Sequence, residues 1–177
     1  MNFKSINPKE LQGNFFELID NKWFLITATK DDFGGIWNTM TASWGGMGIM
    51  WGKPVVWCVI RPVRYTYEFM EEADNFTLTF FPEEYRKQLN ILGTKSGRDM
   101  DKKRNSGLTP ALAVMDNENL KNAVFFEEAD TVLICKKLYY QDVNPDNFIV
   151  KDLDKNYPKK DYHRMYFGEI VNCMVKE

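Results

Sequence analysis

The sequence predicts a mainly β fold, an antiparallel barrel with peripheral helices. Three observations lead to this prediction. Apolar, β-rich segments recur at short spacing along the chain, the helical patterns between them are few and short, and no repeat or Gly/Ser-rich linker divides the 177 residues. Because domains usually have roughly 100–200 residues, we expect one domain over residues 1–177.

Seven segments are predicted to be strands. They combine β-branched and aromatic residues or alternate polar with apolar ones, and turn residues or prolines bound them. In chain order they are residues 23–29, 38–44, 55–60, 75–81, 122–126, 131–140 and 166–175, with a turn cluster at 31–35 after the first. The run 55–60 is apolar throughout, as expected for a strand covered on both faces.

Three short helices are predicted between the strands. Residues 66–73 form the first, with Thr66 as a candidate N-cap, and residues 83–92 and 99–105 form the other two. Many strands with scattered helices favour a closed barrel over a doubly wound sheet.

Composition and charge exclude several classes of protein. Apolar residues make up 44% of the chain and aromatic residues 15%, which is enough for a core and excludes intrinsic disorder. The 23 Lys and Arg residues nearly balance 25 Asp and Glu, giving a net charge of −2. This balance argues against a nucleic-acid binder with a broad basic face, although a local basic pocket for one small anion remains compatible with it.

Cysteine usage indicates a reducing compartment. Cys58, Cys135 and Cys173 are odd in number, widely spaced and surrounded by apolar residues, so we interpret them as three buried thiols. The N-terminal segment lacks the apolar region of a signal peptide, and no run of about 18 apolar residues predicts a membrane span. We therefore expect a cytoplasmic protein that does not contact a membrane.

Common catalytic and nucleotide-binding motifs are not found. The segment Gly46–Trp51 begins like a dinucleotide fingerprint, but Trp51 replaces the third glycine and Pro54 follows where a helix should run. His163 is the only histidine, so neither a metal site nor a nucleophile–histidine pair is indicated. We predict no catalytic side chain and no metal, and an imported cofactor becomes the favoured source of chemistry.

Three polar clusters could form one ligand site. The first combines hydroxyls, an amide and an aromatic ring ahead of two glycines, and comprises Asn38, Thr39, Met40, Thr41, Ala42, Ser43 and Trp44. A strand with outward Thr and Ser, leading into a glycine-rich hairpin, explains it equally well.

The second and third clusters are basic. Arg61, Arg64, Tyr65 and Thr66 lie where an apolar strand meets a predicted helix start, which suits a phosphate dianion. Ser96, Gly97, Arg98 and Lys102 form a turn with flanking cations, which is typical of an anion site. A solvated strand end and a polar loop before a capped helix are the alternatives. Together the three clusters fit a small, flat, phosphorylated ligand.

The order of these motifs resembles a known family. The chain carries Asn38-x-Met40-Thr41-x-Ser43-Trp44-Gly45, then Arg61-Pro62-x-Arg64-Tyr65-Thr66, then Ser96-Gly97-Arg98-Asp99-x-Asp101-Lys102, then Phe167-Gly168-Glu169-Ile170-Val171. In these motifs it is similar to the flavin reductase-like, FMN-binding split-barrel proteins, and most similar to their flavoredoxin-type branch. The resemblance extends from residue 23 to residue 175.

The resemblance implies a six-stranded split barrel, a homodimer in most members, that binds FMN without a covalent bond near the subunit interface. The segment 38–44 would line the flavin ring, 61–66 would reach the phosphate, and 96–102 would add polar contacts. A late residue, His163 or Tyr166, would lie beside the ring. Residues 144–162 do not match the family pattern.

The resemblance also implies two activities. The first is an NAD(P)H-dependent flavin or ferric reductase, in which hydride passes from nicotinamide to flavin N5. The second is an electron carrier that exchanges electrons with a redox protein and has no substrate of its own. A barrel with a structural or storage role, whose polar clusters lie on the surface, is a third interpretation of the residues.

Overall fold

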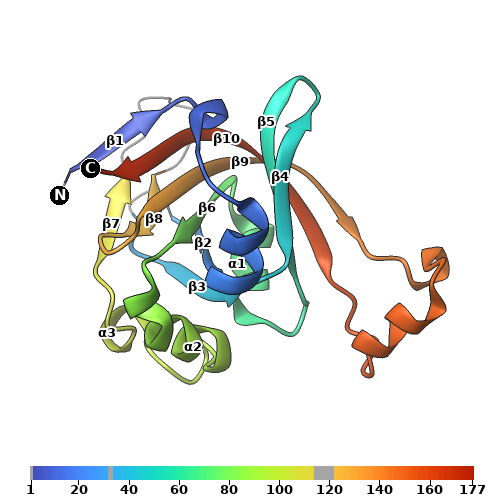
Figure 1. The fold of residues 1–177 in the computed structure, drawn as a ribbon. Helices are drawn as coiled ribbons and strands as arrows, with labels where there is room; N and C mark the ends of the chain where they lie inside the picture. Colours follow the sequence, from blue (N-terminus) through green and yellow to red (C-terminus); the bar gives the residue numbers. More distant parts are fainter. Residues whose placement is uncertain (1, 32–33, 114–121) are drawn as a thin grey trace.

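The computed structural model describes residues 2–31, 34–113 and 122–177. In these residues an antiparallel sheet of eight strands curls into a barrel (Figure 1). Its strands are β1 (Phe3–Ile6), β2 (Phe24–Thr29), β3 (Trp37–Ala42), β4 (Gly45–Met50), β5 (Lys53–Ile60), β6 (Asn75–Phe80), β9 (Thr131–Asp142) and β10 (Arg164–Lys176). A smaller sheet pairs β7 (Pro110–Ala113) with β8 (Ala123–Phe126).

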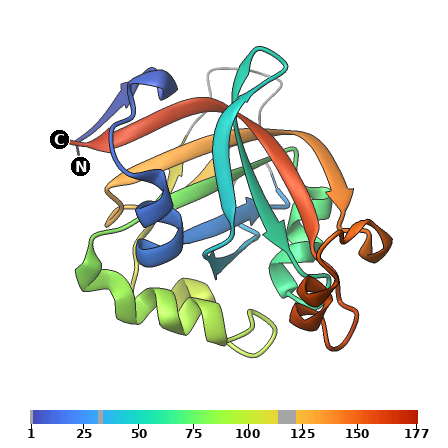
Figure 2. The same cartoon turned by 45° about the vertical axis from the view of Figure 1, so that its right-hand side comes forward.

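Short helices connect the strands. The α-helices of the described residues are α1 (Tyr65–Glu72), α2 (Arg86–Thr94) and α3 (Lys102–Asn105). Single 3₁₀ or π turns cover Pro8–Glu10, Glu17–Lys22, Glu83–Tyr85, Pro145–Asn147 and Lys151–Asn156. Figure 2 shows α2 along the lower side of the barrel.

The barrel is split between β3 and β4. The strand order is β3-β2-β6-β9-β10-β5-β4, so β3 and β4 are the two ends of the hydrogen-bonded path. Only Ser43 and Trp44 separate the end of β3 from the start of β4, which brings the two ends together. We call this meeting point the seam. The last strand, β10, pairs with β9, with β5 through Arg164–Glu169, and with β1 through Cys173–Lys176.

The hairpin of β4 and β5 rises from the barrel (Figure 1) and explains the glycine-rich segment. A Cβ atom on Gly45 would lie 2.5 Å from the Trp57 carbonyl oxygen, and one on Gly46 would lie 2.1 Å from the Trp57 ring. The turn places Trp51 and Gly52 at φ angles of 53° and 71°. Gly45 and Gly46 therefore allow β4 to pack closely against Trp57.

Two cores hold the structure together. One fills the barrel and includes Phe69 and Met70 of α1, and the other lies between the sheet, α2 and the small sheet, where Leu89 and Leu92 pack. β2 contributes to both cores, while β6 contributes to the barrel core and packs its other face against β8, so all residues of both strands are buried. A strand covered on both faces has β-branched or apolar residues at successive positions, and this is the pattern that predicted both strands.

All three cysteines are free and fully buried, as predicted from their spacing and surroundings. Burial raises the pKa of each thiol, Cys58, Cys135 and Cys173, so each stays protonated. No helix in the described residues is long and apolar enough to cross a membrane.

All seven predicted strands are present, with boundaries shifted by a few residues. The predictions missed β1, β4 and β7, and the large sheet has eight strands where the resemblance implied six. The N-cap prediction was wrong: Arg64 precedes α1, and Thr66 lies inside the helix. Asp32 and Phe33 of the predicted turn lie outside the described residues.

Candidate functional site

A trough made of two hollows lies beside the seam. The outer hollow, about 260 Å³, is lined by residues 40–44, Val59, Arg61, Arg64, Gly93 and His163. The inner hollow, about 170 Å³ and more enclosed, is lined by Asn38, Met40, residues 63–66, residues 94–97 and Lys102. Met40 and Arg64 line both, so the hollows adjoin. No Asp or Glu among the described residues lines either one.

Arg64 lies where the two hollows join. It is the residue before α1, and its Nη2 donates to the carbonyl oxygen of Gly93 at 2.7 Å. Burial, and secondarily the charge of Arg61, lower the pKa of its guanidinium. The guanidinium has five N–H donors, so others remain for a ligand in the trough.

Lys102 is a buried cation in the wall of the inner hollow. Its side chain comes from α3, the residue is 5% exposed, and Nζ donates to the carbonyl oxygens of Thr39 at 2.6 Å and Leu92 at 3.0 Å. Burial, and then the charge of Arg64, lower the pKa of Lys102 to about 8. An ammonium has three donors, so one is left for an anion.

Two hydroxyl groups of the inner hollow are arranged as donors. Thr66 Oγ1 accepts a hydrogen bond from Asn38 Nδ2 at 2.8 Å, and Ser96 Oγ accepts one from the Arg98 backbone N–H at 3.1 Å. Since each oxygen already accepts, its own proton can be donated to a ligand. The first N–H groups of α1 have no partner within the helix, and residues 63–66 carry that helix start into the hollow.

The outer hollow is flatter and less charged. Thr41 Oγ1 donates to the carbonyl oxygen of Leu89 at 2.5 Å, which fixes β3 against α2. Trp44 is 48% exposed, and its ring lies 5.2 Å from that of His163. Ser43 lies beside it in the wall. This end of the trough can accept a flat, partly apolar ring.

Residues 143–163, which we call the arm, connect β9 to β10 and project from the barrel (Figure 1). Arg61 donates to both carboxylate oxygens of Asp161, at 2.9 and 3.1 Å, and to the Asn156 carbonyl at 2.8 Å. The charge of Arg61 is therefore neutralised by the arm. The resemblance left residues 144–162 unassigned, and the structure places this segment behind the site wall, where it holds the lining residues Arg61 and His163.

His163 ends the arm and lines the outer hollow. Its Nδ1 lies 2.9 Å from the Tyr157 hydroxyl oxygen. Burial, and then the charge of Arg61, lower the pKa of His163 to about 4, although Asp161 acts in the opposite direction. The imidazole is therefore uncharged at neutral pH.

Most of the predicted site residues meet in the trough. They are Asn38, Met40, Thr41, Ala42, Ser43, Trp44, Arg61, Arg64, Tyr65, Thr66, Ser96, Gly97, Lys102 and His163. The structure does not bring the side chains of three others there. Thr39 Oγ1 bonds the Ile26 carbonyl and Thr27 inside the barrel. Arg98 pairs with Glu68 and packs over the Tyr65 ring. Tyr166 is fully buried, with its hydroxyl on Glu71.

Some residues that line the trough could not be predicted as site residues from the sequence. Gly93 and Thr94, at the end of α2, line the trough, and a Cβ on Gly93 would lie 3.1 Å from Thr41 Cβ. A glycine after a predicted helix was the available signal. Tyr157 and Asp161 do not line the trough but contact its residues His163 and Arg61, and their segment gave no sequence signal. In the described part of the chain, no group of three or more His, Cys, Asp or Glu side chains could hold a metal ion.

The fold is thus a split antiparallel barrel with a trough beside its seam that Arg64 and Lys102 line. Residues 18–177 match the model of the flavin reductase like domain, and the chain belongs to that family. This confirms the family resemblance drawn from the four motifs. Comparison with curated proteins found no match.

Solved structures of this family share the fold. An FMN-binding domain of a flavin reductases-like enzyme from Shewanella baltica is 18% identical, with a TM-score of 0.64 over 98% of this chain and 77% of that one. The flavoredoxin of Desulfovibrio vulgaris is 22% identical, with a TM-score of 0.63 over 88% and 69%. The styrene monooxygenase flavin reductase of Pseudomonas putida is 15% identical, with a TM-score of 0.59 over 88% and 80%. The predicted mainly β, split-barrel class is thus confirmed, with a different strand number.

Proposed function

We propose that the protein binds FMN in the trough, with the phosphate in the inner hollow and the ring in the outer hollow. The observation that carries the proposal is the contrast between the two hollows. The enclosed one has Arg64, Lys102 and the hydroxyl donors Thr66 and Ser96, while the open one is flat and flanked by Trp44. Without a carboxylate in the wall, a dianion meets donors alone.

The donor set fits a phosphate. Arg64, Lys102, Thr66 and Ser96 each keep at least one donor beyond the bonds they make within the protein. Each charge-assisted hydrogen bond contributes about 1.5–3 kcal/mol. Arg61, paired with Asp161, is not assigned to the phosphate, in contrast to its place in the predicted phosphate cluster.

The ring end would hold the isoalloxazine against residues 40–44. Ser43 and the backbone of β3 would bond its polar edge, and Trp44 would pack beside it. When bound, FMN would supply hydride and single-electron chemistry, and the chain would contribute binding, orientation and electrostatics. Thr39, Arg98 and Tyr166 would support the walls from positions outside the trough.

We further propose that the protein uses NAD(P)H to reduce flavin or a ferric complex. The outer hollow is open, which leaves room for a second ring beside the first, and the family includes reductases such as the styrene monooxygenase flavin reductase. The alternative is electron carriage to a protein partner, as the flavoredoxins among the structural neighbours suggest by name. Neither activity requires a protein acid–base group.

Two measurements test these proposals. Absorbance of the purified protein, before and after addition of FMN, should show bound flavin, and a colourless protein that takes up none would favour a structural barrel. Steady-state oxidation of NADH or NADPH should then occur with FMN added. No turnover with intact bound flavin would favour the electron carrier.

A homodimer is part of the proposal. Exposed apolar side chains gather on the β4–β5 hairpin and on β9, where Ile49, Met50, Trp51 and Tyr139 are more than a third exposed. Met50, Trp51 and Tyr139 border a hollow of about 600 Å³ that Phe148 of the arm also lines. Large exposed apolar patches are typical of protein interfaces. We further propose a cytoplasmic location, in keeping with three reduced thiols.

A further inference from the structure

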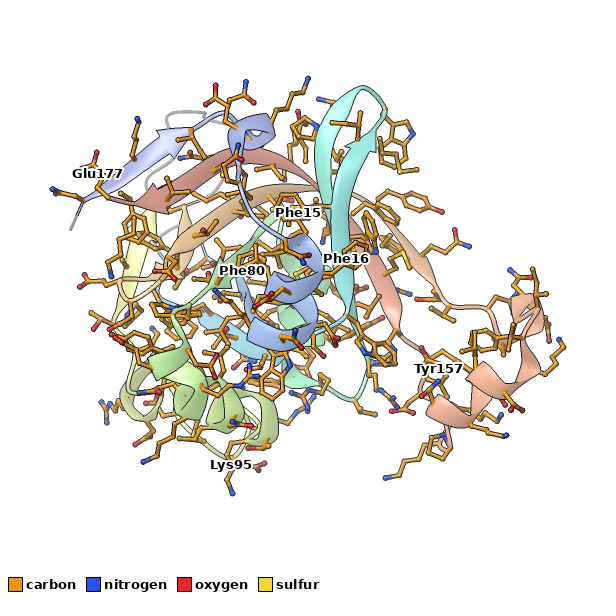
Figure 3. The ribbon with its side chains drawn as sticks, viewed as in Figure 1. Phe15, Phe16, Phe80, Lys95, Tyr157 and Glu177 are labelled. Carbon is orange, nitrogen blue, oxygen red and sulfur yellow. The ribbon has the colours of Figure 1, made fainter. Side chains whose placement is uncertain are left out.

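The arm holds the single histidine of the chain in a specific way. Tyr157 comes from the turn that ends the Lys151–Asn156 segment and is 6% exposed. Its ring packs against Phe148 and Tyr162, at 6.1 and 4.9 Å between centroids, and lies beneath the Arg61 guanidinium at 5.0 Å. Figure 3 shows Tyr157 on the arm, away from the body of the barrel. A side chain packed on these sides has little freedom to move its hydroxyl.

The hydroxyl of Tyr157 is aimed at His163. Burial is the main cause that raises the pKa of Tyr157, so its phenol keeps its proton at neutral pH. In the described residues its hydrogen-bond partner is Nδ1 of His163, at 2.9 Å. A phenol is a good donor and a weak acceptor, whereas an unprotonated imidazole nitrogen is a good acceptor. The favoured arrangement is therefore O–H donating to Nδ1.

That arrangement determines which ring nitrogen of His163 is available to a ligand in the trough. When Nδ1 accepts, the proton of a neutral imidazole must be on Nε2. Nδ1 is occupied by Tyr157, so Nε2 is the ring nitrogen left for a ligand in the outer hollow. The charged groups that face the imidazole are Arg61 and Asp161, which pair with each other and leave no net charge beside it.

We propose that Tyr157 is a positioning residue that fixes His163 as the neutral tautomer with its proton on Nε2, and that this N–H donates to a carbonyl oxygen of a flat, uncharged ring in the outer hollow. The inference rests on the proposed function for the identity of the ring. Either the isoalloxazine of FMN or the carboxamide of nicotinamide can supply such an oxygen. The tautomer itself does not depend on any ligand.

The experiment uses ¹⁵N nuclear magnetic resonance of the imidazole, because one histidine in 177 residues gives one set of signals. In the ligand-free protein at pH 7 we expect a protonated Nε2 and an unprotonated Nδ1, with no conversion to the charged form until well below pH 6. A charged ring at pH 7, or a proton on Nδ1, would overturn the proposal.

Variants separate positioning from packing. Tyr157→Phe keeps the aromatic ring and removes the donor, so the two nitrogen signals should move toward each other as the tautomers mix. The ligand that accepts the Nε2 hydrogen bond, FMN or nicotinamide, should bind about 2–10-fold more weakly, as expected for one hydrogen bond. Tyr162→Phe is the matched control, because the Tyr162 hydroxyl donates to Asp154 at 2.7 Å. It should leave the histidine signals unchanged. Equal changes in both variants would show a packing effect and contradict the proposal.

Ligand additions then identify the ring. A shift of the Nε2 signal with FMN alone assigns the isoalloxazine, and a shift only when nicotinamide is added to the FMN-loaded protein assigns the carboxamide. Binding of both without any shift overturns the ligand half of the inference. Failure of FMN to bind, seen by absorbance, refutes the proposed function and that half together, while the ligand-free spectrum still decides the tautomer.

Discussion

Arg61, in the outer hollow, and Arg64, where the two hollows join, are three residues apart in the sequence but have different partners. Arg61 donates to Asp161 and to the Asn156 carbonyl, so the arm fully engages it. Arg64 donates to a neutral carbonyl and has no carboxylate beside it in the hollow. The comparison shows that the residue type alone does not tell whether an arginine is available to bind an anion. An arginine already paired with a carboxylate, such as Arg61, is a poorer candidate than one without such a partner.

The largest expected effect comes from removing Arg64. Arg64→Ala should weaken FMN binding about 10–100-fold, the equivalent of one buried charge-assisted contact, and should leave riboflavin, which has no phosphate, nearly unaffected. Arg61→Ala is the matched control and should change the ratio of the two affinities less than about 3-fold. Fluorescence titrations measure both ligands. Equal losses for FMN and riboflavin would point to structural damage and remove the contrast between the two arginines.

The second prediction concerns pH at the inner hollow. The pKa of Lys102 is lowered to about 8, so ligand-free protein loses this charge as pH rises through that value. A bound dianion favours the ammonium, so binding above pH 8 takes up a proton, and the FMN dissociation constant should rise up to about tenfold per pH unit. Riboflavin affinity and the FMN affinity of Lys102→Met should depend little on pH. Parallel pH profiles for both ligands would exclude Lys102 from the phosphate site.

A smaller effect is expected from releasing Arg61. Asp161→Asn removes the carboxylate partner while preserving the side-chain shape, so the arm loses its ionic contact with the barrel. We expect faster tryptic cleavage at the arm residues Lys151, Lys155 and Lys159, and little change in the preference for FMN over riboflavin. If the variant instead gained affinity for FMN alone, Arg61 would be close enough to the phosphate to bind it, and the contrast with Arg64 would weaken.

The effect on FMN affinity expected at Trp44 is smaller than that expected at Arg64. Its ring is half exposed, so Trp44→Ala should weaken FMN less than about 10-fold, which is below the cost of a buried aromatic truncation. Flavin emission should increase, because an indole beside the ring quenches it. An unchanged emission spectrum with bound flavin would place the ring away from the outer hollow.

Much of the fold could be predicted because its strands carry strong local signals. β2, β6 and the first part of β9, residues 132–135, are buried and rich in β-branched, aromatic or other apolar residues, so pattern and burial agree. β4 could not be predicted, because Gly45, Gly46 and Gly48 have low strand propensity, and the strand depends on pairing with β5 and on close packing of Gly45 and Gly46 against Trp57. That contact is a tertiary one and leaves no local trace.

Residues of the candidate site could be predicted where a local sequence pattern, such as a strand–helix junction, also places the side chain in the trough. Arg64 and Thr66 stand at a strand–helix junction, a local pattern that also places them in the trough. Arg98 and Tyr166 have suitable chemistry but turn toward Glu68 and Glu71, which the sequence alone did not indicate. The role of the arm could not be predicted either, because the arm contacts Arg61, which lies some hundred residues earlier in the chain.

The two-residue seam between β3 and β4 has a consequence for local dynamics. β3 is hydrogen-bonded to β2 along one edge and ends the sheet on the other, so amide groups along its free edge lack strand partners. FMN in the trough, as proposed, would lie against this edge. Deuterium uptake should therefore be fastest along β3 in the empty barrel and should slow on loading, while the double-sided strands β2 and β6 exchange slowly in both states.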